Sequence, residues 1–230
     1  MFGVIPAFWQ RRGTAPPVGD VTIYEGGHTV PQEVGGTALA QHDLFVARLD
    51  TFATLTFDEE VSPGVPVYAP GDPVLGVGFA RNGITMTLSC SSPSGIEEIS
   101  ADTTSGRFNT TPLSFADVVE LFADNLKISS SAPITMNFSP NVAALGFYAT
   151  DIGDFGGVVK LRLTKNDATT IEYTMLIDVS TTNGNVYFWG IVDTTGTTYS
   201  KVEFISSDPG LDDFFGLDDV IYVDDTYILP

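Results

Sequence analysis

The chain has 230 residues, of which 43% are hydrophobic and 11% aromatic, so it is long enough to bury the core of one large domain. Its 29 acidic and 10 basic residues give a formal net charge of −19, which argues against nucleic acid and against an anionic membrane surface as partners. A single cysteine excludes an internal disulfide, and no apolar run is long enough to predict a membrane span.

Residues 1–19 differ in composition from the rest of the chain. They hold two basic residues and no acidic residue, so the remainder carries 8 basic (10 − 2) against 29 acidic residues, a charge of −21. A cationic, aromatic arm joined through Pro16-Pro17 to an acidic body is typical of a docking element, although chain termini are also where disorder concentrates. The residues that we expect to make this contact are Phe2, Ile5, Phe8, Trp9, Arg11 and Arg12.

The arm does not have the pattern of a secretory signal peptide. Its apolar stretch is short, is interrupted by Pro6 and precedes the two arginines instead of following them. We therefore expect the protein to be made in a cytoplasm and to reach any outer surface by assembly or lysis.

The segment after the arm gives a weaker pattern. Residues 18–24 are predicted to form a short strand that ends at Gly26-Gly27, whereas residues 37–50 fit either a helix or a strand. His28 and His42 are the only histidines of the sequence, and neither has a second ligand at metal-binding spacing. We interpret both as ordinary loop or surface residues.

From residue 51 the pattern becomes that of β structure. Residues 51–58 alternate apolar and polar positions and are predicted to form a strand. Asn82-Gly83 lies between the apolar runs 74–80 and 84–89, which predicts a hairpin. One helix of about three turns is predicted over residues 114–126, because apolar residues recur there at helical spacing behind an N-cap serine.

The last hundred residues are predicted to be a series of short strands separated by turn residues. Spacing of about ten residues between strands is typical of a β-sandwich. The predicted strands cover residues 132–138, 143–149, 157–163, 170–179, 185–193, 201–206 and 219–223. We therefore predict an all-β fold, with an arm and linking segment over residues 1–50 and one antiparallel two-sheet sandwich over residues 51–230.

The final predicted strand begins with two adjacent carboxylates, Asp218 and Asp219. Aspartate is depleted in strands, so these charges need stabilisation. Backbone N–H groups could provide it, and so could a hard cation such as calcium, which takes oxygen ligands. The alternative is an acidic turn exposed to water.

Three motifs resemble a known family. Residues 134–155, 187–193 and 215–219 resemble, in the same order, the ectodomains of bacterial exported proteins that carry a PEP-CTERM sorting tail. The resemblance covers about residues 51–226 and implies a galactose-binding-type jelly roll, similar to non-catalytic carbohydrate-binding modules. It also implies a structural calcium held by Asp58, Asp218 and Asp219. No signal peptide, Pro-Glu-Pro motif or basic tail is evident, so we do not expect the anchoring of that family to carry over.

Two functions fit these features. The preferred one is a structural protein of a tailed-phage virion, which is made in the host cytoplasm and binds other virion proteins through its arm as a capsid decoration protein. Jelly rolls are common in viral particles, and many copies or a homo-oligomer would fit that role. The alternative is a calcium-dependent carbohydrate-binding module of a cell surface or the extracellular space.

A glycan site would need aromatic side chains at the surface. Tyr187 and Trp189 are candidates, because alternate positions of one strand face the same side, although core packing is the more common role of such residues. Enzymatic activity is not expected, since no nucleophile–base pair and no phosphate-binding glycine loop is evident.

Overall fold

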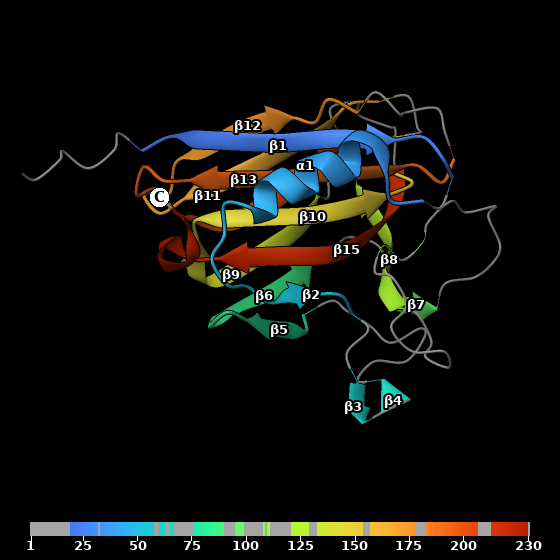
Figure 1. Cartoon of the computed structure of the whole chain (residues 1–230), viewed down its shortest axis with the longest axis horizontal. Helices are drawn as coiled ribbons and strands as arrows, with labels where there is room; N and C mark the ends of the chain where they lie inside the picture. Colours follow the sequence, from blue (N-terminus) through green and yellow to red (C-terminus); the bar gives the residue numbers. More distant parts are fainter. Residues whose placement is uncertain are drawn as a thin grey trace, which may run out of the picture.

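The chain forms two antiparallel β-sheets that pack face to face, with one α-helix on the outer side of the larger sheet (Figure 1). The computed structural model describes residues 19–31, 33–57, 60–62, 65–66, 76–89, 95–98, 108, 110, 121–128, 133–153, 157–177, 183–206 and 213–229. The predicted two-sheet antiparallel β-sandwich is therefore confirmed.

Among the described residues, the larger sheet has seven strands and the smaller sheet has six. In spatial order, the larger sheet contains β1 (Val21–His28), β13 (Val186–Asp193), β10 (Ala144–Thr150), β15 (Asp213–Val223), β8 (Leu121–Ile128) and β7 (Gly95–Glu98), and β2 (Thr54–Leu55) also pairs with β15. The smaller sheet contains β12 (Thr170–Thr174), β11 (Val159–Lys165), β14 (Tyr199–Ser206), β9 (Ile134–Val142), β6 (Ile84–Ser89) and β5 (Gly78–Arg81). A separate hairpin consists of β3 (Glu60–Ser62) and β4 (Val65–Pro66).

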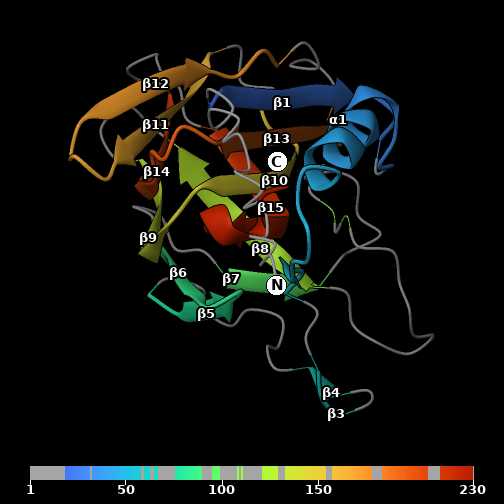
Figure 2. The same cartoon turned by 60° about the vertical axis from the view of Figure 1, so that its left-hand side comes forward.

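The strands from β8 to β15 follow the connectivity of a jelly roll. The chain alternates between the two sheets at each step except the β11–β12 hairpin, and β8-β15-β10-β13 faces β9-β14-β11-β12. This order corresponds to the two interlocked Greek keys of a double-sheet jelly roll. Figure 2 shows β11 and β12 in one layer and β1 and β13 in the other.

Alternating side chains fill the space between the sheets. Buried and half-buried residues alternate along β11, as expected for a strand with one face on the core. The middle of the core is aromatic: Phe147 packs against Trp189 at a ring-centroid distance of 5.8 Å and against Phe204 at 5.2 Å. Each such pair contributes about 0.5–1.5 kcal/mol beyond the area that it buries.

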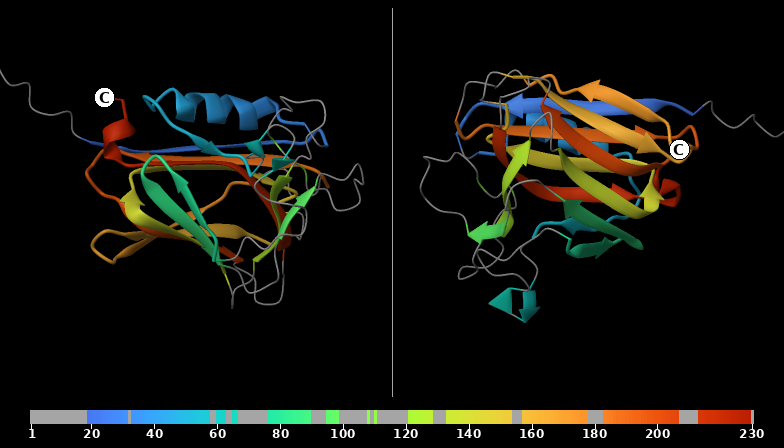
Figure 3. Two further views of the ribbon diagram at one scale, coloured as in Figure 1. Left: turned by 90° about the horizontal axis from the view of Figure 1, so that it is seen from below. Right: turned by 180° about the vertical axis from the view of Figure 1, so that it is seen from behind.

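A second apolar cluster lies under the helix α1 (Gly36–Val46), which covers the outer face of the larger sheet (Figure 3). Phe45 is fully buried over Gly146 and Gly190, which pair with each other across β10 and β13. A Cβ atom on Gly190 would lie 2.8 Å from Phe45 Cδ2, so the ring occupies a notch that two glycines provide. Tyr24 packs edge-on against the same ring at 5.9 Å, which fixes the end of the helix on the sheet.

The first fifty residues contribute more to the sandwich than the predicted linking segment implies. β1 pairs with β13 along its whole length, from Val21 opposite Asp193 to His28 opposite Val186. The strand continues through Gly26 and Gly27, which were expected to end it. In the ambiguous stretch 37–50, the residues up to Val46 belong to the helix α1. β1 therefore belongs to the larger sheet, and α1 covers the outer face of that sheet.

The helix predicted over residues 114–126 is wrong where the structure describes it. Residues 121–126 belong to β8, which pairs with β15 on one side and β7 on the other, and residues 114–120 lie outside the described part. Pairing with two neighbouring strands outweighs a local pattern that fits a helix, because strand formation depends on its tertiary context.

Most other predicted elements overlap strands of the structure, although the strand predicted over residues 51–58 is reduced to Thr54–Leu55 among the described residues. Each of the seven strands predicted after residue 131 overlaps one of the strands β9 to β15. The Asn82-Gly83 hairpin joins β5 to β6, with φ angles of 53° and 76° at the two turn residues. Positive φ at both positions is the geometry that the Asn-Gly pair favours.

Candidate functional site

A β-bulge in β15 sets the positions of the two adjacent aspartates. Phe215, Leu217, Val220 and Tyr222 all belong to the core between the sheets. Two residues, Asp218 and Asp219, therefore separate the inward-facing Leu217 from the inward-facing Val220, where regular alternation would leave one. The pairing register with β10 shifts at the same place, and Asp219 has a φ of 48°. A non-glycine residue in this left-handed region is uncommon, and bulges of this kind redirect side chains.

Asp218 is completely buried and is stabilised by hydrogen bonds from the protein itself. Its Oδ2 accepts from the backbone N–H of Thr110 at 2.7 Å, and its Oδ1 accepts from the backbone N–H of Asp219 at 2.8 Å. Of the two means of stabilisation that the sequence suggested, backbone N–H groups are therefore present at this carboxylate. Each oxygen of this buried carboxylate therefore has a hydrogen-bond donor from the backbone.

The hydroxyl of Thr110 lies between the two carboxylates. Its Oγ1 is 3.0 Å from Asp218 Oδ2 and 2.8 Å from Asp219 Oδ2. A hydroxyl has one proton to donate, so these two acceptors share one donor. The contact brings two negative charges close together at a partly buried place and ties residue 110 to the sheet.

A pocket of about 380 Å³ opens beside this pair of aspartates. Its lining comes from α1, β2, β10, β15 and the segments before α1 and around residue 110, and consists of Val34, Leu39, His42, Thr54, Thr110, Tyr148 and Asp219. The pocket lies on the outer face of the larger sheet, beside the helix that covers that face.

The aromatic wall of the pocket is formed by His42 and Tyr148. The two rings stack at 5.4 Å with an interplanar angle of 25°, and His42 Nδ1 lies 3.2 Å from Asp43 Oδ1. Burial, and after it the charges of Asp219 and Asp43, raise the pKa of Tyr148 well above the ordinary range of a tyrosine. The phenol is therefore neutral at physiological pH and keeps a proton to donate.

The predicted metal ligands are brought together only in part. Asp218 and Asp219 lie side by side, while Asp58 lies outside the described residues. The described residues contain no group of three histidine, cysteine, aspartate or glutamate side chains arranged to hold a metal ion. The oxygen donors of Asp219 and Thr110 are of the kind that calcium takes, but Asp218 already accepts a hydrogen bond on each of its oxygens, so a calcium ion would depend mainly on Asp219.

The predicted glycan residues do not lie at the surface. Tyr187 and Trp189 are 1% and 0% exposed and belong to the core between the sheets. The hydroxyl of Tyr187 donates to Glu25 Oε2 at 2.9 Å, which satisfies its polar end inside the protein. Their role in this fold is core packing, the alternative given from the sequence.

The predicted docking residues Phe2, Ile5, Phe8, Trp9, Arg11 and Arg12 all lie outside the described part of the chain. His42, by contrast, was expected to be an ordinary residue and instead lines the pocket. The sequence contained a sign of the bulge, because the inward positions change phase across Asp218-Asp219, but nothing that pointed to Thr110.

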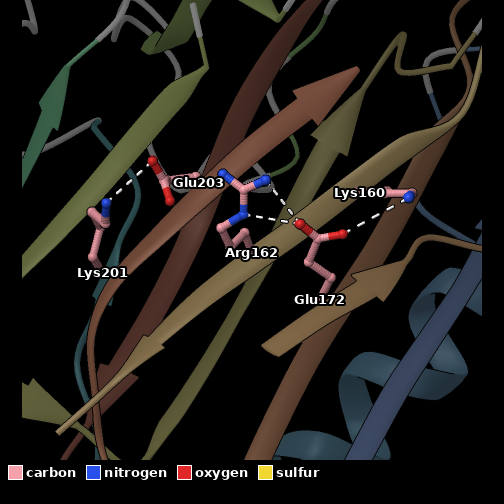
Figure 4. A network of polar contacts seen from close by, with 5 residues as sticks. All are labelled: Lys160, Arg162, Glu172, Lys201 and Glu203. Atoms are coloured by element: carbon pink, nitrogen blue, oxygen red, sulfur yellow. Dashed lines mark hydrogen bonds and ion pairs between the residues drawn. The ribbon is translucent and has the colours of Figure 1, made fainter. Parts of the chain in front are cut away.

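Three basic side chains lie on the outer face of the smaller sheet, Lys160, Arg162 and Lys201, but their contacts are those of an ordinary exposed strand surface. Arg162 Nη2 lies 2.8 Å from Glu172 Oε1 across β11 and β12, and Lys201 Nζ lies 3.1 Å from Glu203 Oε1 (Figure 4). The hydrogen bond from Arg162 is the main cause of the lowered pKa of Glu172. Exposed ion pairs of this kind contribute little to stability, so this network is not a candidate site.

Comparisons with family models, curated proteins and solved structures found no match for this chain. The resemblance noted in the sequence thus extends, in the structure, to a two-sheet antiparallel β-sandwich and not to a family. In the described part of the chain, no helix has the length and apolar character needed to cross a membrane.

Proposed function

We propose that the protein is a non-enzymatic structural component of a tailed-phage virion, made in the host cytoplasm and attached to the outside of the capsid through residues 1–19. The proposal combines a sandwich that would serve as a rigid, acidic body with an arm of opposite charge. Its expected partners are other virion proteins.

The observation that carries the proposal is the distribution of aromatic side chains. In the described part of the chain, the exposed large hydrophobic residues are all valines and leucines, while the aromatic side chains of the body are buried or half-buried. The segment before β1 contains Phe2, Phe8 and Trp9 together with Arg11 and Arg12. Aromatic residues and arginine dominate binding hot spots, so this segment is the strongest candidate for a protein contact.

The place where the arm joins the body supports the same proposal. Asp20 donates its backbone N–H to Thr194 Oγ1 at 2.8 Å and accepts from the backbone N–H of Thr194 at 2.9 Å. The end of β13 therefore holds the chain immediately before β1. A load on the arm would be transferred to β13, the second strand of the larger sheet. Repetition around a particle would add avidity to each weak contact.

The test is rebinding to particles that have been stripped of the protein. Deleting residues 1–15 is expected to leave the melting temperature nearly unchanged and to abolish rebinding. The double variant Phe8→Ala/Trp9→Ala should weaken rebinding more than the matched single variant Arg11→Ala, because salt screens an exposed charge but not a buried ring. Rebinding by the truncated protein would place attachment on the sandwich, and unfolding of the truncated protein would assign the arm to the core; either result would refute the proposal.

A second candidate function is a calcium-dependent carbohydrate-binding module. It is favoured by the oxygen donors of Asp219 and Thr110 beside a pocket with an aromatic wall. The burial of Tyr187 and Trp189 removes the platform that the sequence offered for a sugar, so this proposal stands behind the first. Binding of a glycan by purified protein in calcium, lost in chelator, would reverse the order.

A further inference from the structure

We propose that, in the free protein, the N-terminal arm binds the outer face of the helix α1 of its own chain. The inference concerns the protein before it meets any partner, so it does not depend on what the arm binds on a particle. It rests on the composition of the exposed side of the helix, the distribution of charge along the chain, and the length of chain between the arm and the helix.

The exposed side of α1 is apolar. Beyond the first turn, the exposed residues of the helix and its C-terminal cap lie on one side, and we call them the outer stripe: Leu39, Ala40, Asp43, Leu44 and Ala47. Leu39 is 41% exposed, Leu44 is 56% exposed, and Asp43 is the only polar member. A helix that lies on a protein surface normally turns polar residues to water, whereas one that is apolar on all sides is covered on all sides. The outer stripe therefore has the composition of a contact surface.

The segment that carries the outer stripe is acidic. From residue 19 to residue 47 the sequence has four acidic residues and no lysine or arginine, and Arg48, past the end of the helix, is the first basic residue after the arm. The side chain of Asp43 is 67% exposed and contacts His42 Nδ1 at 3.2 Å through one of its oxygens. An occupant that brings positive charge to this side of the helix is attracted to it, and an acidic occupant is repelled.

The arm matches the outer stripe in both respects. It combines the aromatic side chains of Phe8 and Trp9 with the charges of Arg11 and Arg12, and it contains no acidic residue. The rest of the chain carries 8 basic against 29 acidic residues, so two bodies brought together would repel each other. The charges therefore favour the arm over the body of a second copy as the occupant.

The arm is long enough to reach the outer stripe of its own chain. It joins the body at Gly19, beside Thr194 at the end of β13, and β1 then leads to Tyr24, which packs against Phe45 of α1 at 5.9 Å. The strand from Gly19 to Tyr24 spans about 17 Å. The chain from Gly19 back to Trp9 can span up to about 35 Å when extended. A contact within one chain also profits from a high effective concentration.

A second exposed apolar surface suits the arm less well and provides a control. Val158 and Leu176 are 43% and 68% exposed and line a groove of about 340 Å³ where β11 begins and β12 ends. Lys160 and Arg162 lie on the same two strands and share the carboxylate of Glu172, so the positive charge exceeds the negative charge there (Figure 4). This surface would repel the arginines of the arm.

The test is acrylamide quenching of tryptophan fluorescence in the free, full-length protein. The chain has two tryptophans, and Trp189 is 0% exposed, so quenching reports on Trp9, with Trp9→Phe as the background. We expect Trp9 to be quenched less in the protein than in a free peptide of residues 1–19. Leu44→Glu should raise the quenching to the level of the peptide, and the matched control Leu176→Glu should leave it unchanged. Equal quenching in wild type and peptide, or no change in Leu44→Glu, would overturn the proposal.

An NMR comparison keeps the result unambiguous if Leu44→Glu folds poorly, because it leaves the helix unaltered. The backbone amide signals of the outer stripe should shift between the wild-type protein and Phe8→Ala/Trp9→Ala, and those of the groove between β11 and β12 should not. Unchanged signals along the outer stripe would refute the contact, and equal shifts at both surfaces would refute its specificity.

Dilution distinguishes a contact within one chain from a contact between copies. The protection of Trp9 should not change on dilution, because the arm and the helix belong to the same molecule. Protection that is lost on dilution would assign the outer stripe to the arm of a second copy and overturn the contact within one chain. These measurements use no particles, so their failure is distinct from a failure of the protein to rebind.

Discussion

Replacing Thr110 by valine tests whether the shared hydroxyl stabilises the two carboxylates. Valine keeps the shape of threonine but has no hydroxyl, so Asp218 and Asp219 lose the donor at 3.0 Å and 2.8 Å while the backbone bond at 2.7 Å remains. Loss of one hydrogen bond to a charged group costs about 1.5–3 kcal/mol. For a domain of this size that corresponds to a fall of about 3–12 °C in the melting temperature.

The matched control is Thr110→Ser, which keeps the hydroxyl and loses one methyl group, at a cost of about 0.8 kcal/mol. Equilibrium denaturation of both variants in urea gives the comparison directly. The explanation predicts that valine is the more damaging change, although it is the better match in shape and more apolar. If Thr110→Val were as stable as Thr110→Ser, the hydroxyl would not stabilise the carboxylates and the account of the site would be wrong.

Three more outcomes are expected. Burial raises the pKa of Tyr199, and so does the hydrogen bond from its hydroxyl to Asp193 Oδ2 at 2.6 Å, so the folded state holds this proton more tightly than the unfolded state. The free energy of unfolding should therefore be maintained up to about pH 10 and fall above it. The fall should be smaller in Tyr199→Phe. Gly190→Ala should destabilise the protein by about 1–3 kcal/mol in urea denaturation, because its methyl group would lie 2.8 Å from the ring of Phe45; a neutral effect would show that the helix shifts freely on the sheet. If calcium binds at Asp219, adding calcium should raise the melting temperature and Asp219→Asn should abolish that rise, whereas identical melting curves with calcium and with chelator would exclude a structural calcium.

The strands were predictable where their pattern is local. The seven strands after residue 131 are separated by turn residues and alternate or run apolar over short lengths, so each can be recognised without knowing its partner. The Asn82-Gly83 hairpin is predictable for the same reason, because two adjacent residues determine its turn.

The elements that were missed depend on distant partners. β8 has a local pattern compatible with a helix and becomes a strand between β15 and β7. The contact of Thr110 with Asp218 joins residues 108 positions apart, and the pocket combines residues from across the chain. A single sequence gives no information about such pairings, although the change of phase between Leu217 and Val220 could have indicated the bulge.

The pairing of β1 with β13 has a consequence for how the protein is made. β1 ends at His28 and its partner strand ends at Asp193, so 165 residues must be synthesised between the two. At about 5–20 residues per second, the first strand leaves the ribosome roughly 10–30 s before the strand that it pairs with is complete. During this interval β1 has no sheet to join, and Tyr24 and Ile23 remain open to other chains on the same messenger. Pairing across so long a stretch of chain also forms late in folding, because the entropy cost of closing the loop comes before the stabilising contacts between the strands. Truncation of the chain before residue 186 would leave β1 without the strand that it pairs with.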